Sequence, residues 1–207
     1  MNCTKRQQHR IKFQLIFMWL YIFVIYLPFF VFMITNHNVN TTSMSSIGWI
    51  TGGIQYLFLY LVIVLPFGLY QIFFFNRYFI NSNTFINAMS SISCSLIAIG
   101  AFIPVTRTRQ FSWGNFIHNF MCIGGSVFLI LTIFFALILH SIKKKHKRII
   151  FILYGIYFLS LLIAFSILRT AAIFQLSATL SFFLVLLFVI TTHSILQQKT
   201  LPTKLTT

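Results

Sequence analysis

The chain has 207 residues, of which 58% are apolar and only 7% are charged, and it contains no Asp or Glu, so its net charge is +15. A soluble domain carries charge on about a quarter of its residues, so this composition excludes a soluble globular protein and predicts an integral membrane protein. The lack of carboxylates also excludes carboxylate-based acid–base catalysis, Mg²⁺ or Ca²⁺ cages and intramembrane carboxylate relays, but it leaves Ser–His and Cys–His pairs open.

Six apolar runs are long enough to cross a bilayer, which takes about 20 helical residues. They cover residues 13–34, 47–75, 85–103, 116–140, 149–168 and 171–195. The last two are divided only around Arg169, but a single helix over 149–195 would be about twice as long as the membrane is thick. The pattern therefore predicts an all-α fold, a polytopic bundle of six transmembrane helices in a single transmembrane domain over residues 1–207.

Basic residues are concentrated in alternate connections. The amino-terminal segment, the connection with Arg77, the KKKHKR stretch at 143–148 and the tail carry most of them, whereas the other connections carry only Arg107, Arg109 and Arg169. Because basic residues gather on the cytoplasmic side, we expect both termini to be cytoplasmic and these three arginines to face outward. Heavy use of Ile, Phe, Asn and Lys is typical of AT-rich genomes and favours a multi-pass protein of a bacterial plasma membrane.

The large positive charge has a second interpretation, which the sequence does not favour. In a soluble protein a charge of this size suggests nucleic-acid binding. Here the charges lie in short segments between apolar runs, where basic residues orient the spans. We therefore predict membrane lipids as partners and no nucleic acid.

Small residues inside the apolar runs predict close packing of helices. Four of them share one face of the third run through spacings of 3, 4 and 3: Ala88, Ser91, Ser95 and Ala98. Two glycine pairs suit the same role: Gly48 with Gly52, and Gly124 with Gly125. Cys94 and Cys122 have no metal-ligand or redox spacing, so we expect them to be small packing residues as well.

The polar residues on the expected outer side form the candidate site: Arg107, Arg109, Arg169 and His118. A guanidinium favours a planar anion, and this chain has no side-chain carboxylate to offer. The expected ligand is therefore a lipid phosphate, a substrate anion or a partner's carboxylate, with simple solvation of the arginines as the alternative. His118 and His37 are too few for a tetrahedral metal site, so we predict no metal and no cofactor.

The connection after the third run also carries a family resemblance. Its matching residues are Gly100, Phe102, Pro104 and His118. They resemble the uncharacterised prokaryotic six-span family known as domain of unknown function 998, which is similar to the group that contains the DRAM and FGF-receptor-activating-protein relatives. The chain departs from the family pattern because Ile103 separates Phe from Pro, no acidic residue follows, and Leu176 replaces an Arg. The resemblance implies six spans and no established reaction, and some relatives of the wider group are linked to lipid handling.

Three functions stay open at this point. The leading hypothesis is a non-enzymatic membrane protein that engages an anionic lipid, a membrane-protein partner or a second copy through the four candidate residues. The second is a small transporter or channel subunit, whose path would be lined by Gln55, Asn87, Ser91, Ser95, Thr132, Gln175 and Thr179. The third is a membrane-embedded lipid-modifying enzyme with His118 as its base, which the missing carboxylates make the least favoured.

Overall fold

A computed structural model describes residues 5–106, 111–142, 147–168 and 171–199, with side chains for 8–106, 111–142, 151–168 and 171–192. Over these residues the regular structure is entirely helical, which confirms the predicted all-α fold. Six helices are long and apolar enough to cross a membrane, which confirms the predicted number of spans. The cytoplasmic position of the termini stays a prediction.

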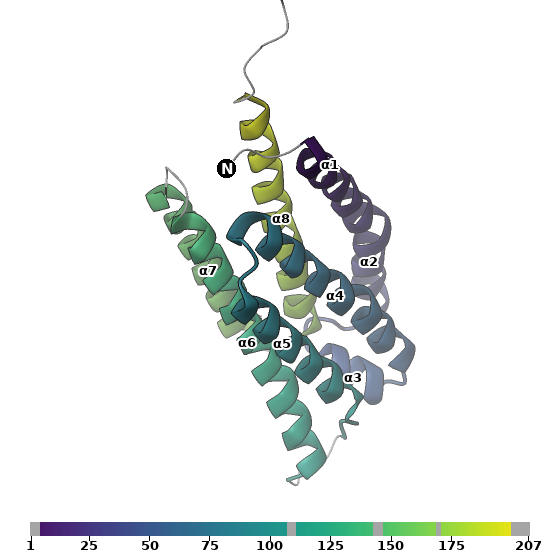
Figure 1. Cartoon of the computed structure of the whole chain (residues 1–207). Coiled ribbons are helices and arrows are strands. Elements are labelled where there is room, and N and C mark those ends of the chain that lie inside the picture. Colours follow the sequence, from purple (N-terminus) through teal and green to yellow (C-terminus); the bar gives the residue numbers. More distant parts are fainter. Residues whose placement is uncertain (1–4, 107–110, 143–146, 169–170, 200–207) are drawn as a thin grey trace, which may run out of the picture. The chain divides into compact units, whose positions relative to one another are not determined.

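The helices follow one another along the chain as Figure 1 shows. The first span consists of α1 (Lys5–Leu20), the π-helix η1 (Tyr21–Tyr26) and α2 (Leu27–Asn36). The short helix α3 (Met44–Trp49) precedes the second span, which consists of α4 (Ile54–Phe75) and the π-helix η2 (Asn76–Ile80). The remaining spans are α5 (Thr84–Phe102), α6 (Trp113–Ile142), α7 (Lys147–Leu168) and α8 (Ala172–Lys199).

The second span begins later than the sequence predicts. Residues 47–53 do not continue α4 but form the end of α3 and a turn. Ser43 starts α3, because its Oγ accepts a hydrogen bond from the amide of Ser46 at 3.1 Å and so caps the helix. The apolar run from Ile47 is therefore shared between two helices, and the spanning helix starts at Ile54.

The glycine pair Gly48 and Gly52 does not form the packing motif that its spacing predicts. Gly48 lies in α3, where an added Cβ would stand 2.7 Å from Cδ2 of Leu57. Its small size therefore lets α3 lie close against α4. Gly52 has a φ of +78°, which glycine adopts at low cost, and it serves the turn between the two helices.

The chain divides into two compact units, which we describe separately. The first contains Met1–Asn36 and Leu176–Thr207, and the second contains His37–Gln175. The expected single domain over residues 1–207 stays a prediction.

In the first unit, η1 turns two tyrosines toward the same aromatic partner. Tyr21 and Tyr26 both meet the ring of Phe183 edge-on, at centroid distances of 5.8 and 5.6 Å. Residues five apart point in different directions on an α-helix, whereas the wider turn of a π-helix brings them together. The Tyr26 hydroxyl also donates to the Leu176 carbonyl at 2.6 Å. Pro28 lies two residues after the end of η1, and its missing N–H accounts for an irregular helix at this point.

In the second unit, α5 and α6 lie side by side with their backbones close together (Figure 1). An added Cβ on Gly100 of α5 would stand 2.8 Å from Cβ of Met121 on α6. An added Cβ on Gly125 of α6 would stand 2.9 Å from Cγ1 of Ile97 and 3.0 Å from the Ser93 carbonyl oxygen. The lack of a side chain at both glycines is therefore what allows the two helices to approach.

Two of the four small residues that the spacing predicts to pack against a neighbour are not buried. Ala88 and Ser95 are exposed. The buried small residues of α5 lie on a neighbouring strip and comprise Ser90, Ser93, Cys94, Gly100 and Ala101. Spacing defines the faces of a helix but does not say which face meets a neighbour, and here the position of α6 decides it. Cys94 and Cys122 are both free thiols; Cys94 is buried and Cys122 is half-buried.

Asparagine side chains hold the connection between the second and third spans. Nδ2 of Asn76 donates to the Asn83 carbonyl and to Oδ1 of Asn87, both at 2.7 Å, and its Oδ1 accepts from the Asn83 amide at 2.9 Å. The side chain of Asn83 then caps α5 by accepting from the amide of Phe85 at 2.9 Å. Neutral amides therefore make this link in a chain that has no carboxylates.

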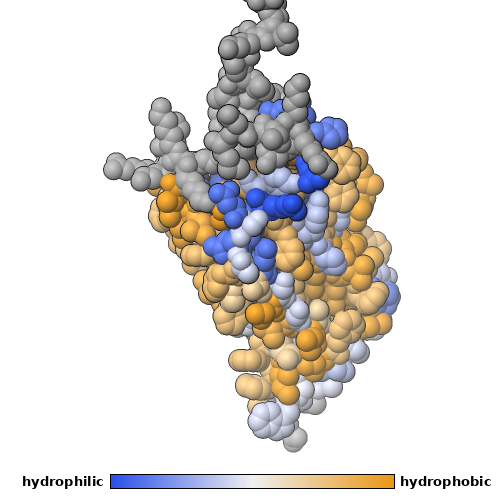
Figure 2. Space-filling model, viewed as in Figure 1, coloured by the Kyte–Doolittle hydropathy of each residue, from blue (hydrophilic) through white to orange (hydrophobic). Residues whose placement is uncertain are grey.

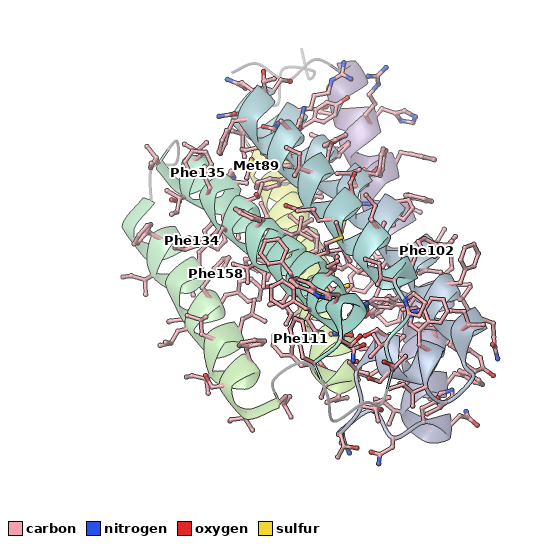
Figure 3. The ribbon with its side chains drawn as sticks, turned by 90° about the horizontal axis from the view of Figure 1, so that it is seen from below. Met89, Phe102, Phe111, Phe134, Phe135 and Phe158 are labelled. Carbon is pink, nitrogen blue, oxygen red and sulfur yellow. The ribbon has the colours of Figure 1, made fainter. Side chains whose placement is uncertain are left out.

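Apolar side chains cover most of the visible surface (Figure 2). On α7 the only buried residue between 151 and 168 is Tyr154, and large side chains such as Ile156 and Leu162 are more than half exposed. The helix meets α6 through the rings of Phe134 and Phe158, whose centroids are 4.3 Å apart. Both residues are labelled in Figure 3. A surface of this kind matches lipid tails rather than water, in agreement with an integral membrane protein.

The neighbouring glycines of α6 provide a matched test of this packing. Gly125→Ala should lower the free energy of unfolding by about 1–3 kcal/mol, because the added methyl group collides with α5. Gly124→Ala should be neutral or stabilise by up to about 1 kcal/mol, because its methyl group meets no atom within 4 Å and alanine favours a helix. Thermal unfolding in a mild detergent measures both, and equal melting temperatures for the two variants would contradict the α5–α6 contact.

Candidate functional site

The buried imidazole of His118 holds the chain where it leaves α5. His118 lies in the second turn of α6, is 2% exposed, and has its Nδ1 3.0 Å from the carbonyl oxygen of Ile103. A carbonyl can only accept a hydrogen bond, so Nδ1 carries the hydrogen and donates it. The bond satisfies a carbonyl group at the end of a helix, where no partner is available within the helix itself.

The side-chain amide of Asn115 binds the next part of the same connection. Its Oδ1 accepts from the Thr106 amide at 3.0 Å, and its Nδ2 donates to the Thr106 carbonyl at 2.9 Å. Asn115 and His118 are three residues apart and therefore share one face of α6. Together they fix residues 103–106, the chain immediately before Arg107.

The connection between the first and second spans also reaches these helix ends. Nε1 of Trp49, at the end of α3, donates to the Ala101 carbonyl at 2.9 Å. The Thr42 carbonyl accepts from the amide of Ala172, the first residue of α8, at 2.7 Å. Carbonyls at the end of α5 and an amide at the start of α8 thus find partners outside their own helices. The result is a well-bonded framework around the candidate loop.

Four exposed aromatic residues gather where α6 begins, and we call them the aromatic cluster: Phe111, Trp113, Phe116 and Phe120. The ring centroids of Phe111 and Trp113 are 5.1 Å apart, those of Trp113 and Phe116 are 6.0 Å apart, and those of Phe116 and Phe120 are 6.4 Å apart. Figure 3 labels Phe111 at this end of α6. Exposed aromatic rings at the end of a membrane-spanning helix are typical of the layer of lipid headgroups.

Of the four candidate residues, the structure places only His118. Arg107, Arg109 and Arg169 lie outside the described residues. The contacts on either side of the first two are nevertheless well defined, since Thr106 is bound by Asn115 and Phe111 packs in the aromatic cluster. His118 is buried and donates to a backbone carbonyl, so its contact positions the loop.

Several polar residues of the transport hypothesis lie in the second unit, where they are exposed or make local hydrogen bonds. Gln55 and Ser95 are exposed. The hydroxyls of Ser91 and Thr132 donate to carbonyls four residues earlier in their own helices, at 2.9 and 2.7 Å. Oε1 of Gln175 accepts from the first amide of α3 at 3.3 Å. These groups make local structural bonds, and the arrangement gives transport no support.

The second unit also contains a buried polar contact that the sequence analysis did not predict. Nδ1 of His140 lies 3.1 Å from the hydroxyl of Tyr154, and both residues are buried. The rings of Phe75 and Phe79 lie beside this histidine, at centroid distances of 5.4 and 6.0 Å. The pair joins α6 to α7, because His140 belongs to α6 and Tyr154 is the only buried residue of α7 between 151 and 168. A lone histidine near the end of an apolar run is the only signal for it in the sequence.

The histidines and cysteines of the described chain lie apart from one another. Among them, no group of three His, Cys, Asp or Glu residues comes together. Cys94 and Cys122 lie within the apolar spans α5 and α6, and His118 and His140 have partners on the chain.

Comparisons with family models, with curated proteins and with solved structures found no match for the chain. The resemblance to the domain of unknown function 998 family therefore rests on the sequence alone and stays a prediction. The structure gives a packing reason for two of its four residues. Gly100 allows the close approach of α6, and His118 binds the carbonyl of Ile103.

Hydrogen exchange tests how firmly Asn115 holds the loop. In Asn115→Ala the Thr106 amide loses its acceptor, and a hydrogen bond of this kind contributes about 1 kcal/mol. We expect the Thr106 amide to exchange roughly fivefold faster in the variant. Asn119→Ala removes an exposed amide from the same helix and should leave this exchange rate unchanged. The contact is refuted if Thr106 exchanges at the same rate in Asn115→Ala and in the unmodified protein.

Proposed function

We propose that the chain is a non-enzymatic integral membrane protein of the plasma membrane that holds an anionic phospholipid at its outer face. Arg107 and Arg109 bind the phosphate, and Arg169 adds to the positive charge on the same side. The observation that carries the proposal is the framework on both sides of the arginine stretch. Asn115 fixes the chain before it, and the aromatic cluster fixes the chain after it.

The chemistry of the arginines favours an anion from outside the chain. A guanidinium group binds phosphate through two parallel hydrogen bonds and keeps its charge at any physiological pH. The sequence has no Asp or Glu, so no side-chain carboxylate competes for these groups. His118 contributes by position, because its bond to the Ile103 carbonyl holds the start of the loop.

The aromatic cluster favours a lipid over a soluble anion. Its rings are exposed at the start of a spanning helix, where aromatic residues lie at the level of the headgroups. Arg107 and Arg109 precede Phe111 by four and two residues, so we expect them in the same layer, in which lipid phosphates are concentrated. A phospholipid contacts both the cations and the rings, whereas a small soluble anion contacts only the cations.

The alternatives explain less of this arrangement. A second copy would bring together two sets of arginines with no carboxylate to pair with them, which is unfavourable. A different protein with acidic residues would satisfy the arginines but leaves the exposed rings without a role. Catalysis by His118 would require an imidazole that is now buried and bonded to a backbone carbonyl.

Native mass spectrometry of the protein from membranes that contain phosphatidylglycerol and phosphatidylcholine tests the proposal. Because charge-assisted hydrogen bonds contribute about 1.5–3 kcal/mol each, Arg107→Gln/Arg109→Gln should retain at least tenfold less phosphatidylglycerol. Arg77→Gln is the matched control, since it removes an exposed arginine from the expected inner side, where it lies over the Tyr78 ring. Equal retention of phosphatidylglycerol by the double variant and the control argues against a lipid site at this loop.

Cysteine labelling tests the orientation that the proposal requires. In a Cys3→Ser background, Thr106→Cys should react with a membrane-impermeant maleimide added to intact cells. Thr84→Cys, at the opposite end of α5, should react only after the cells are opened. Both side chains are exposed, so access from one side of the membrane decides the result. Labelling of Thr84→Cys in intact cells, with Thr106→Cys protected, would reverse the orientation.

A further inference from the structure

Three spans of the second unit meet at the imidazole of His140. This residue lies near the end of α6 and is 4% exposed. Its Nδ1 is 3.1 Å from the hydroxyl of Tyr154 on α7. The rings of Phe75, at the end of α4, and Phe79, in η2, lie beside it with interplanar angles of 65° and 80°. A titratable side chain therefore lies where α6, α7 and the second span join.

Within the second unit, α7 is attached to α6 through few side chains. Tyr154 is the only buried residue of α7 between 151 and 168, and most of the large apolar side chains of this helix are exposed. The rings of Phe134 and Phe158 make a second contact with α6 (Figure 3). The attachment of α7 therefore depends strongly on the pair that Tyr154 forms with His140.

The neutral imidazole suits this position better than the charged one. A neutral ring has one donor and one acceptor nitrogen, so Nδ1 can share a hydrogen bond with a hydroxyl group in either direction. A buried charge is costly unless an opposite charge lies beside it, and the chain has no Asp or Glu to supply one. The attraction between a cation and an aromatic ring is small beside that cost.

The groups around His140 oppose a positive charge or leave it unbalanced. Tyr154 faces it from α7, and a phenol ionises only near about pH 10. The second span contributes two uncharged rings, while its Arg77 is exposed and lies over a neighbouring tyrosine ring. The basic stretch at 143–148, whose side chains lie outside the described residues, follows closely along the chain. Its charges add to the repulsion of a further cation.

We propose that His140 is an acid-sensitive joint, whose protonation releases α7 from α6. Histidine is the side chain that gains its charge between about pH 8 and pH 5. His140 lies two residues before the end of α6, so a small shift brings a charged imidazole to lipid headgroups and water. The contact with Tyr154 is therefore present at high pH and is lost as the pH falls. This device does not depend on the lipid proposed for the outer face.

The distance between α5 and α7 reports the release. It is measured by double electron–electron resonance on the full-length protein in nanodiscs of phosphatidylcholine. Nitroxide labels are attached at Ile92→Cys and Leu159→Cys, whose native side chains are exposed on these two helices. The natural cysteines are replaced in this background by Cys3→Ser, Cys94→Ala and Cys122→Ala.

Three variants separate the joint from other effects of pH. His140→Phe replaces the imidazole with an aromatic ring that takes no charge. His37→Phe is the matched control, because His37 also lies in the second unit and packs against an aromatic ring, with its centroid 4.9 Å from that of Tyr56. Tyr154→Phe removes the hydroxyl partner and keeps the ring. If His140→Phe does not fold, His140→Gln replaces it.

The expected result is specific for His140. With the natural histidines, the fraction of molecules with a longer distance between α5 and α7 should rise at least about tenfold from pH 8 to pH 5, because one ionisation shifts an equilibrium by up to tenfold per pH unit. His37→Phe should respond in the same way. His140→Phe should keep the short distance at both pH values. Tyr154→Phe should release α7 at a higher pH, because it weakens the attached state.

Four results would overturn the inference. An unchanged distance at pH 8 and pH 5 in the labelled protein would leave His140 as a hydrogen-bonded packing residue. A pH response that persists in His140→Phe or His140→Gln would assign the response to another group. Loss of the response in His37→Phe would show that it is not specific for the joint. Release of α7 at an unchanged pH in Tyr154→Phe would exclude the tyrosine hydroxyl from it.

Discussion

The close contact between α5 and α6 determines the arrangement of the candidate site. Gly100 and Gly125 let the two backbones approach, and this approach sets the rotation of α6 about its own axis. One face of α6 then presents Asn115 and His118 to the chain that leaves α5. The opposite face carries exposed phenylalanines, among them Phe116 and Phe120. A single helix contact therefore positions both the start of the loop and the aromatic cluster.

The lack of any acidic side chain shapes how the protein is held together. The polar links between helices described above are neutral hydrogen bonds, such as the one from the Trp49 side chain to the Ala101 carbonyl at the end of α5. Such bonds suit a membrane, because buried ion pairs carry a high desolvation cost there. The same lack leaves the arginines without a partner of opposite charge on any side chain. The charge that stays unbalanced within the chain is therefore available for an external anion.

The sequence predicts the spans well because length and hydropathy are properties of each segment alone. Six spans follow from them, and the structure agrees. The start of the second span was missed, because Gly52 and the cap at Ser43 interrupt an apolar run without changing its hydropathy. The prediction of which face of α5 packs against a neighbour was wrong for Ala88 and Ser95, because both are exposed. Which face meets a neighbour depends on tertiary contacts, which spacing within one helix does not contain.

The neighbours Gly124 and Gly125 show the same limit at the scale of one residue. The sequence presents them as a single packing pair, but successive residues on a helix point about 100° apart. Gly125 therefore faces α5, whereas an added Cβ on Gly124 would meet no heavy atom within 4 Å. The role of a small residue in a membrane protein depends on what fills the space that it leaves. At Gly125 a neighbouring helix fills it, so the lack of a side chain serves the close approach of α5, whereas at Gly124 no contact within the described chain requires a glycine.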